Sequence, residues 1–106
     1  MKNKHDEFRE FAKIRSEVVT AIQSFIETDL SIIETFIQTA QQWYRLKKRA
    51  DAERAMAAGK KGIDTIQRAL STNYSFDPQF KARSLSHCMQ LEYRLLTIKQ
   101  QDAQPS

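Results

Sequence analysis

The first 58 residues of the chain contain neither glycine nor proline, the two residue types that most often interrupt a helix. Large apolar residues in this stretch, beginning with Phe8, recur at intervals of three, four or seven positions. That spacing places them on one face of an α-helix and does not fit the alternation of a strand. Because only two glycines and two prolines occur in all 106 residues, we predict an all-α fold.

Capping signals divide this helical pattern and predict an antiparallel bundle of four helices. Residues 28–31 offer N-cap side chains, and Ser31 and Glu34 have the spacing of a capping box. Further along, Asp77 followed by Pro78 is typical of a helix start. The predicted helices span residues 4–28, 31–48, 52–70 and 78–100.

A continuous first helix is the alternative, because the apolar period runs through the proposed break with only Asp29 out of phase. A helix over residues 4–48 would be roughly 68 Å long, and two later helices of about 20 residues each would cover only half of it. The phenylalanines left uncovered would then need a second copy of the chain. A break therefore predicts a compact monomer, whereas a continuous helix predicts a dimer.

Length and composition indicate a single domain. With 41% hydrophobic and 28% charged residues, the chain resembles a soluble globular protein in composition. We expect one helical domain over residues 1–100 and a disordered tail over residues 101–106. The charged N-terminus and the lack of a long apolar run predict neither a signal peptide nor a membrane span. The single cysteine, Cys88, suits a reducing compartment, so the predicted location is the cytoplasm.

Residues 31–71 are predicted to form a helical hairpin at the centre of the bundle. Its first helix directs Phe36 and Trp43 inward, and its second helix carries mostly small residues, including Gly59, on the facing stripe. Close approach of a neighbouring backbone at Gly59 would offset the cost of about 1 kcal/mol that glycine carries inside a helix. Gly62 lies off this stripe, so the same explanation does not apply to it.

This hairpin resembles a tetratricopeptide repeat, a helix-turn-helix unit of about 34 residues with small and bulky side chains at fixed offsets. The matching positions are Phe36, Ala40 and Trp43 in the first helix and Ala52, Met56 and Gly59 in the second. The chain is likewise similar to small uncharacterised bacterial proteins built from one such hairpin with flanking helices. Thr39 stands where the repeat prefers leucine, Asp64 stands where it often has proline, and no second repeat follows. The resemblance therefore implies a fold more than a peptide-binding groove.

No catalytic or metal-binding pattern is present. His5 and His87 are far apart in sequence, and Cys88 is adjacent to the second, so the number and spacing of ligands in a metal site are lacking. Adjacent helical residues do not face each other, so His87 and Cys88 do not form a nucleophile and base pair. The GKKG segment at 59–62 lacks the flanking residues of a phosphate-binding P-loop. We therefore expect no enzyme activity, no metal and no cofactor.

Positive charge is concentrated in the central hairpin, where residues 31–70 hold eight basic and four acidic side chains. The turn of this hairpin also carries an aromatic and an aliphatic residue, which makes it the candidate partner-binding surface. This surface consists of Tyr44, Arg45, Leu46, Lys47, Lys48 and Arg49.

The favoured function is a small non-enzymatic protein–protein interaction or adaptor module. It would act through helix-face packing with itself, as a homodimer, or with a partner protein, and not with a membrane. The alternative is a basic nucleic-acid-associated protein, in which lysines and arginines of the hairpin neutralise phosphates. The residues of that alternative are Lys47, Lys48, Arg49, Lys60 and Lys61.

Overall fold

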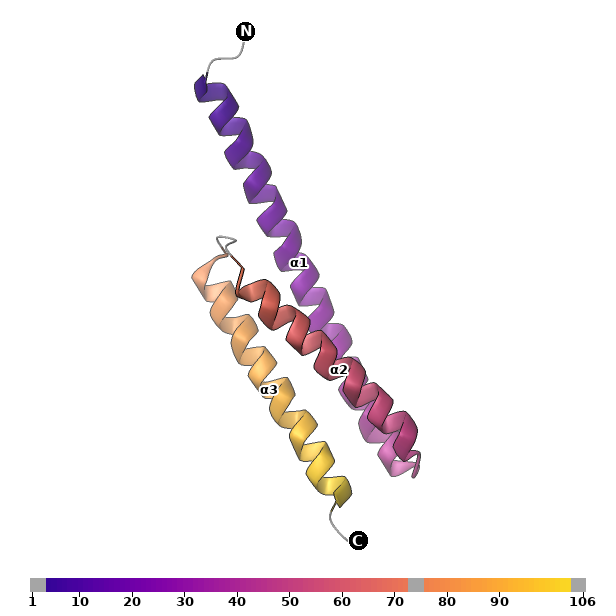
Figure 1. The fold of residues 1–106 in the computed structure, drawn as a ribbon. Helices are drawn as coiled ribbons and strands as arrows, with labels where there is room; N and C mark the ends of the chain where they lie inside the picture. Colours follow the sequence, from indigo (N-terminus) through magenta and orange to yellow (C-terminus); the bar gives the residue numbers. More distant parts are fainter. Residues whose placement is uncertain (1–3, 73–75, 104–106) are drawn as a thin grey trace.

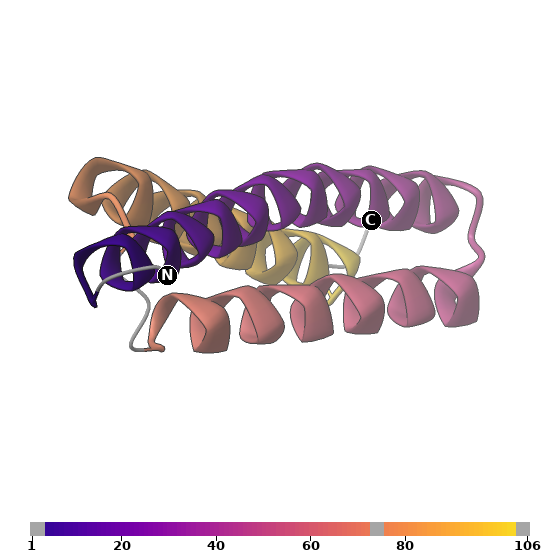
Figure 2. The same cartoon turned by 90° about the horizontal axis from the view of Figure 1, so that it is seen from above.

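The computed structural model describes the backbone of residues 4–72 and 76–103, and the protein is all-helical over these ranges. Three helices follow one another along the chain: α1 (Lys4–Arg45), α2 (Arg49–Leu70) and α3 (Pro78–Ala103). The chain reverses direction after α1 and again after α2, so that α3 runs parallel to α1 (Figure 1). Seen from above, the three helices surround a shared interior (Figure 2).

The predicted bundle of four helices is wrong, because α1 continues through residues 28–31 without a break. A single buried face holds this region together, and its side chains stay in helical phase across the proposed boundary. They are Ile26, Leu30, Ile33, Ile37 and Ala40. The hydroxyl of Thr28 donates to the carbonyl oxygen of Ser24 at 3.1 Å, so this residue bonds within the helix instead of capping a new one. The continuous helix is therefore the alternative that the structure confirms.

The other boundaries differ from the prediction by a few residues. The turn after α1 occupies residues 46–48, and α2 begins at Arg49 with Lys48 as its N-cap residue. Asp77 caps α3 as expected, since the backbone N–H of Gln79 donates to its Oδ1 at 3.1 Å. Helix α3 continues through Ala103, so the tail predicted for 101–106 begins inside the helix, and residues 104–106 lie outside the described ranges.

The turn between α1 and α2 closes as a Schellman motif. The N–H of Lys48 donates to the carbonyl oxygen of Trp43 at 2.8 Å, and the N–H of Lys47 donates to that of Tyr44 at 3.0 Å. Lys47 sits in the left-handed region with φ of 62°, the position that glycine usually takes in this motif. This tight turn sets α2 directly against α1.

The close approach predicted at Gly59 occurs instead at Gly62, for which the sequence offered no explanation. A Cβ added to Gly62 would lie 2.8 Å from Cγ1 and 2.9 Å from Cδ1 of Ile33, closer than real side chains approach. A Cβ added to Gly59 would lie no nearer than 3.8 Å, which is an ordinary contact with Phe36. The close approach of α1 and α2 is therefore at Gly62, and Gly59 leaves room for a methyl group.

The N-terminal part of α1 extends past the other two helices (Figure 1). The side chains of residues 6–18, which we call the arm, are all exposed, and the first buried side chain of α1 is Ile26. The chain measures 74 × 20 × 15 Å and has a radius of gyration of 19.1 Å, whereas a compact domain of this length would have about 13 Å. The three helices therefore form a small packed body from which about a third of α1 projects.

Candidate protein-interaction surface

The predicted partner-binding surface lies at the turn between α1 and α2, but one of its six residues belongs to the interior. Tyr44 is half-buried against the core, and its hydroxyl donates to the sulfur of Met56 at 3.3 Å. The other five side chains are exposed around the turn. They are Arg45, Leu46, Lys47, Lys48 and Arg49. The structure thus brings one apolar side chain, Leu46, together with four cations at one end of the molecule.

The basic residues of the nucleic-acid alternative form two separate groups. Lys60 and Lys61 lie about 17 Å along α2 from Arg49, on a helix that also carries carboxylates between them. Arg49 pairs with Glu53, with 3.3 Å between Nε and Oε1. Arg54, one turn further along α2, pairs with Asp51. Part of the positive charge is therefore balanced on the same face of the helix.

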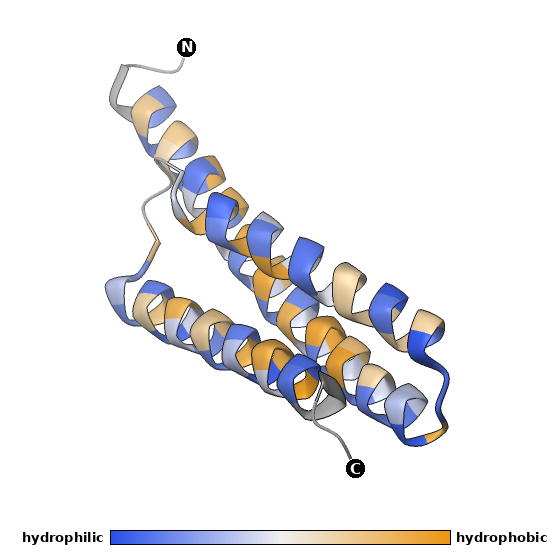
Figure 3. Ribbon diagram, turned by 60° about the horizontal axis from the view of Figure 1, so that its bottom comes forward, coloured by the Kyte–Doolittle hydropathy of each residue, from blue (hydrophilic) through white to orange (hydrophobic). Residues whose placement is uncertain are grey.

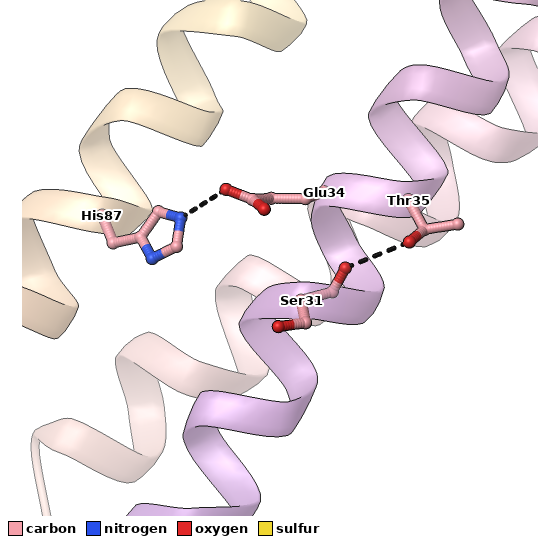
Figure 4. A network of polar contacts seen from close by, with 4 residues as sticks. All are labelled: Ser31, Glu34, Thr35 and His87. Carbon is pink, nitrogen blue, oxygen red and sulfur yellow. Dashed lines mark hydrogen bonds and ion pairs between the residues drawn. The ribbon is translucent and has the colours of Figure 1, made fainter.

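Two polar contacts attach α3 to the other helices. His87 Nε2 and Glu34 Oε1 lie 2.9 Å apart between α3 and α1 (Figure 4), and Gln67 donates to Glu92 at 2.8 Å between α2 and α3. Glu34 thus contacts α3 instead of completing a capping box with Ser31. These contacts fix the position of α3 along the other helices.

Cys88 is fully buried, although it follows the half-buried His87 in sequence. Burial and the negative charge of Glu92 raise the pKa of the Cys88 thiol above its ordinary value. A reactive cysteine needs a lowered pKa and access to solvent, so this thiol has the properties of a core residue. Within residues 6–72 and 76–100, the structure contains no group of three or more metal-ligating side chains. No described helix has both the length and the apolar content to cross a membrane.

One open groove lies between α2 and the C-terminal half of α3, with a volume of about 610 Å³. Its floor is apolar, with Met56 and Leu95 beside Tyr44, and its rim carries both acidic and basic side chains. The mixture of opposite charges at the rim does not select a ligand of one sign.

Most of the large exposed apolar side chains lie on α1. The four-helix prediction placed them in the core, whereas the continuous-helix alternative left its phenylalanines uncovered. Seven large apolar side chains on this helix are between 36% and 72% exposed, and we call them the outer stripe. They are Phe8, Phe11, Ile14, Val18, Phe25, Ile32 and Phe36. Hydrophobic residues continue into the part of α1 that projects from the body (Figure 3).

Four members of the outer stripe follow a seven-residue repeat. This repeat is out of phase with the buried residues on the inner face of α1. Phe11, Val18, Phe25 and Ile32 follow one another at intervals of seven, each on the exposed side of the helix. A coiled-coil seam has two apolar positions in each heptad, and the first of them is apolar in all four heptads here. The repeat runs across the predicted break at residues 28–31, and this continuity was the sequence signal that could have identified the surface.

A second and smaller exposed apolar group lies on the outer face of α3, and we call it the α3 patch. It consists of Leu85, Met89, Tyr93 and Leu96. Its members span only three turns and lack a sustained seven-residue repeat.

No family model matches the chain, and no curated protein or solved structure is significantly similar to it.

Proposed function

We propose that this protein is a small non-enzymatic interaction module that binds a protein helix along the outer stripe of α1. The observation that carries the proposal is the row of seven exposed apolar side chains with a seven-residue repeat. The stripe extends from Phe8 to Phe36, which is about 42 Å along the helix. A partner helix of similar length would cover it completely.

The size of the exposed surface supports this proposal. At about 200 Å² for each phenylalanine, the fractional exposures of the four phenylalanines in the stripe correspond to roughly 500 Å² of apolar surface. The largest patch on a typical monomer is about 300–600 Å², and such patches are often functional. The three aliphatic residues bring the total close to the roughly 800 Å² per partner that a stable interface buries.

The proposal is tested by thiol protection in cells that naturally make the protein. Phe25→Cys places a thiol in the outer stripe, and Met89→Cys places a matched thiol in the α3 patch, each in a Cys88→Ala background. We expect maleimide to label the cysteine at position 89 and to label the cysteine at position 25 slowly, because the bound partner covers it. Equal, rapid labelling of both positions in the cell would contradict the proposed function.

A further inference from the structure

The identity of the partner helix rests on the proposed function of the outer stripe. We propose that the helix bound there is α1 of a second copy of this chain, running antiparallel to the first. The midpoint of the stripe, between Phe8 and Phe36, is Ile22. A two-fold axis beside Ile22 makes the stripe complementary to itself, as the interface of a symmetric dimer must be.

In this arrangement each arm lies over the body of the other chain. Phe8 of one chain packs beside the partner's Phe36, and the reverse contact occurs at the other end. Phe25 and Ile32 of the body, which α2 and α3 leave exposed, are covered by the partner's arm. No large apolar residue of the stripe is left outside the contact.

The side chains along the seam fit an antiparallel pair because each of its two phenylalanines meets a smaller residue. In an antiparallel coiled coil, the first apolar position of each heptad packs against the second apolar position of the partner. The seam layers are centred one position beyond Ile22, because the pairs that flank an antiparallel seam are staggered against its layers. These layers are Phe11 with the partner's Thr35, Val18 with the partner's Thr28, Phe25 with the partner's Ala21, and Ile32 with the partner's Ile14. A parallel pair would instead set Phe11 against the partner's Phe11 and Thr28 against the partner's Thr28, which alternates crowding with voids.

The two threonines of the seam can be buried without leaving a polar group unpaired. Thr28 Oγ1 donates to the carbonyl oxygen of Ser24 at 3.1 Å, and Thr35 Oγ1 donates to that of Ser31 at 3.2 Å. Figure 4 shows Thr35 on the side of α1 that points away from His87 and α3. Since both hydroxyls are already bonded, the methyl groups are what a partner helix would meet.

The charges beside the seam are also complementary. Arg15 and Asp29 lie seven residues to either side of Ile22, so the antiparallel pair places Arg15 beside the partner's Asp29 at two symmetric positions. Neither side chain has an ion-pair partner within the described part of its own chain. Both charges are therefore available to specify the antiparallel direction.

A charge exchange tests this arrangement in the purified full-length chain. We expect light scattering to give twice the 12.4 kDa mass of one chain. Arg15→Asp alone and Asp29→Arg alone should each weaken the dimer by about tenfold, since each replaces two attractions with two repulsions. The double variant Arg15→Asp/Asp29→Arg should restore the wild-type affinity. The matched control Met89→Ser in the α3 patch should leave the affinity unchanged.

Disulfide trapping decides the direction. In a Cys88→Ala background, a Phe8→Cys chain mixed with a Phe36→Cys chain should give the mixed disulfide, and neither chain alone should cross-link efficiently. A dimer in which each chain cross-links to itself, or in which Met89→Ser alone causes dissociation, would overturn the inference. A purified chain that stays monomeric at all concentrations would also overturn it. If the cysteine at position 25 is still protected in cells in that case, the proposed function stands with a different partner.

Discussion

A pair of glycine-to-alanine substitutions in α2 should have different effects on stability, a gain at Gly59 and none at Gly62. Alanine is favoured over glycine inside a helix by about 1 kcal/mol. At Gly59 the added methyl group meets its nearest atom at 3.8 Å, so the free energy of unfolding should rise by about 1 kcal/mol. At Gly62 the methyl group would meet Ile33 at 2.8 Å, and Ile33 is itself buried. Overpacking of this kind costs about 1–3 kcal/mol, so Gly62→Ala should be neutral or up to about 2 kcal/mol less stable than the wild type.

Urea unfolding at one fixed chain concentration, followed by circular dichroism, measures both variants. In an Ile33→Val background the loss at Gly62→Ala should shrink, because Cδ1, one of the two atoms too close to the new methyl group, is absent. The reasoning is refuted if the two alanine variants differ by less than about 0.5 kcal/mol, or if Gly62→Ala is the more stable of the two.

Three further predictions concern the turn and the buried thiol. Lys47→Gly should stabilise the chain by about 0.5–1 kcal/mol, because Lys47 holds a left-handed conformation that glycine adopts more easily. Lys48 has a φ of −100°, so the control Lys48→Gly should bring no gain in the same unfolding assay. Burial and Glu92 raise the pKa of the Cys88 thiol in the folded chain, so the unfolded chain loses the thiol proton at a lower pH. The wild type should therefore lose stability relative to Cys88→Ala as the pH rises above about 8.5. The chain should elute from heparin at low salt, and changing residues 47–49 to glutamate should not alter this; strong retention that the variant abolishes would favour the nucleic-acid alternative.

Local signals in the sequence predicted the helical class and the hairpin. The predicted helix boundary at residues 28–31 was wrong, because the same residues fit both a helix cap and a continuous apolar face. Ser31 and Glu34 have capping-box spacing, yet the buried phase of Ile26, Leu30 and Ile33 keeps the helix intact through that point. Burying three aliphatic side chains against α2 and α3 contributes several kcal/mol, whereas a cap contributes about 1 kcal/mol. Tertiary packing therefore decides the boundary, and a capping signal alone could not.

The candidate surface was harder to predict because apolar periodicity does not say what covers it. Phe25 and Ile26 are neighbours in sequence, but one is exposed and the other is fully buried. Both belong to repeats of helical period, so the apolar pattern predicts two apolar faces on α1 without ranking them. The exposed face is the one that the proposed partner helix would cover. The position of Gly62 opposite Ile33 likewise depends on the register between α1 and α2, which composition does not encode.

Removing residues 1–18 deletes the arm and leaves the body, which keeps Phe25, Ile32 and Phe36 of the outer stripe. The side chains that pack against the core begin at Val19, so this deletion removes no buried residue among those described. A helix of about 15 residues without tertiary contacts is marginal in water, so a bound partner would stabilise the arm. We therefore expect the shortened chain to unfold at a midpoint that does not change with concentration, whereas the midpoint of the full chain should rise with concentration, as it does when association stabilises the folded state. If the shortened chain lacked a cooperative transition, the arm would be part of the folded body, and the division of α1 into an arm and a body segment would be wrong.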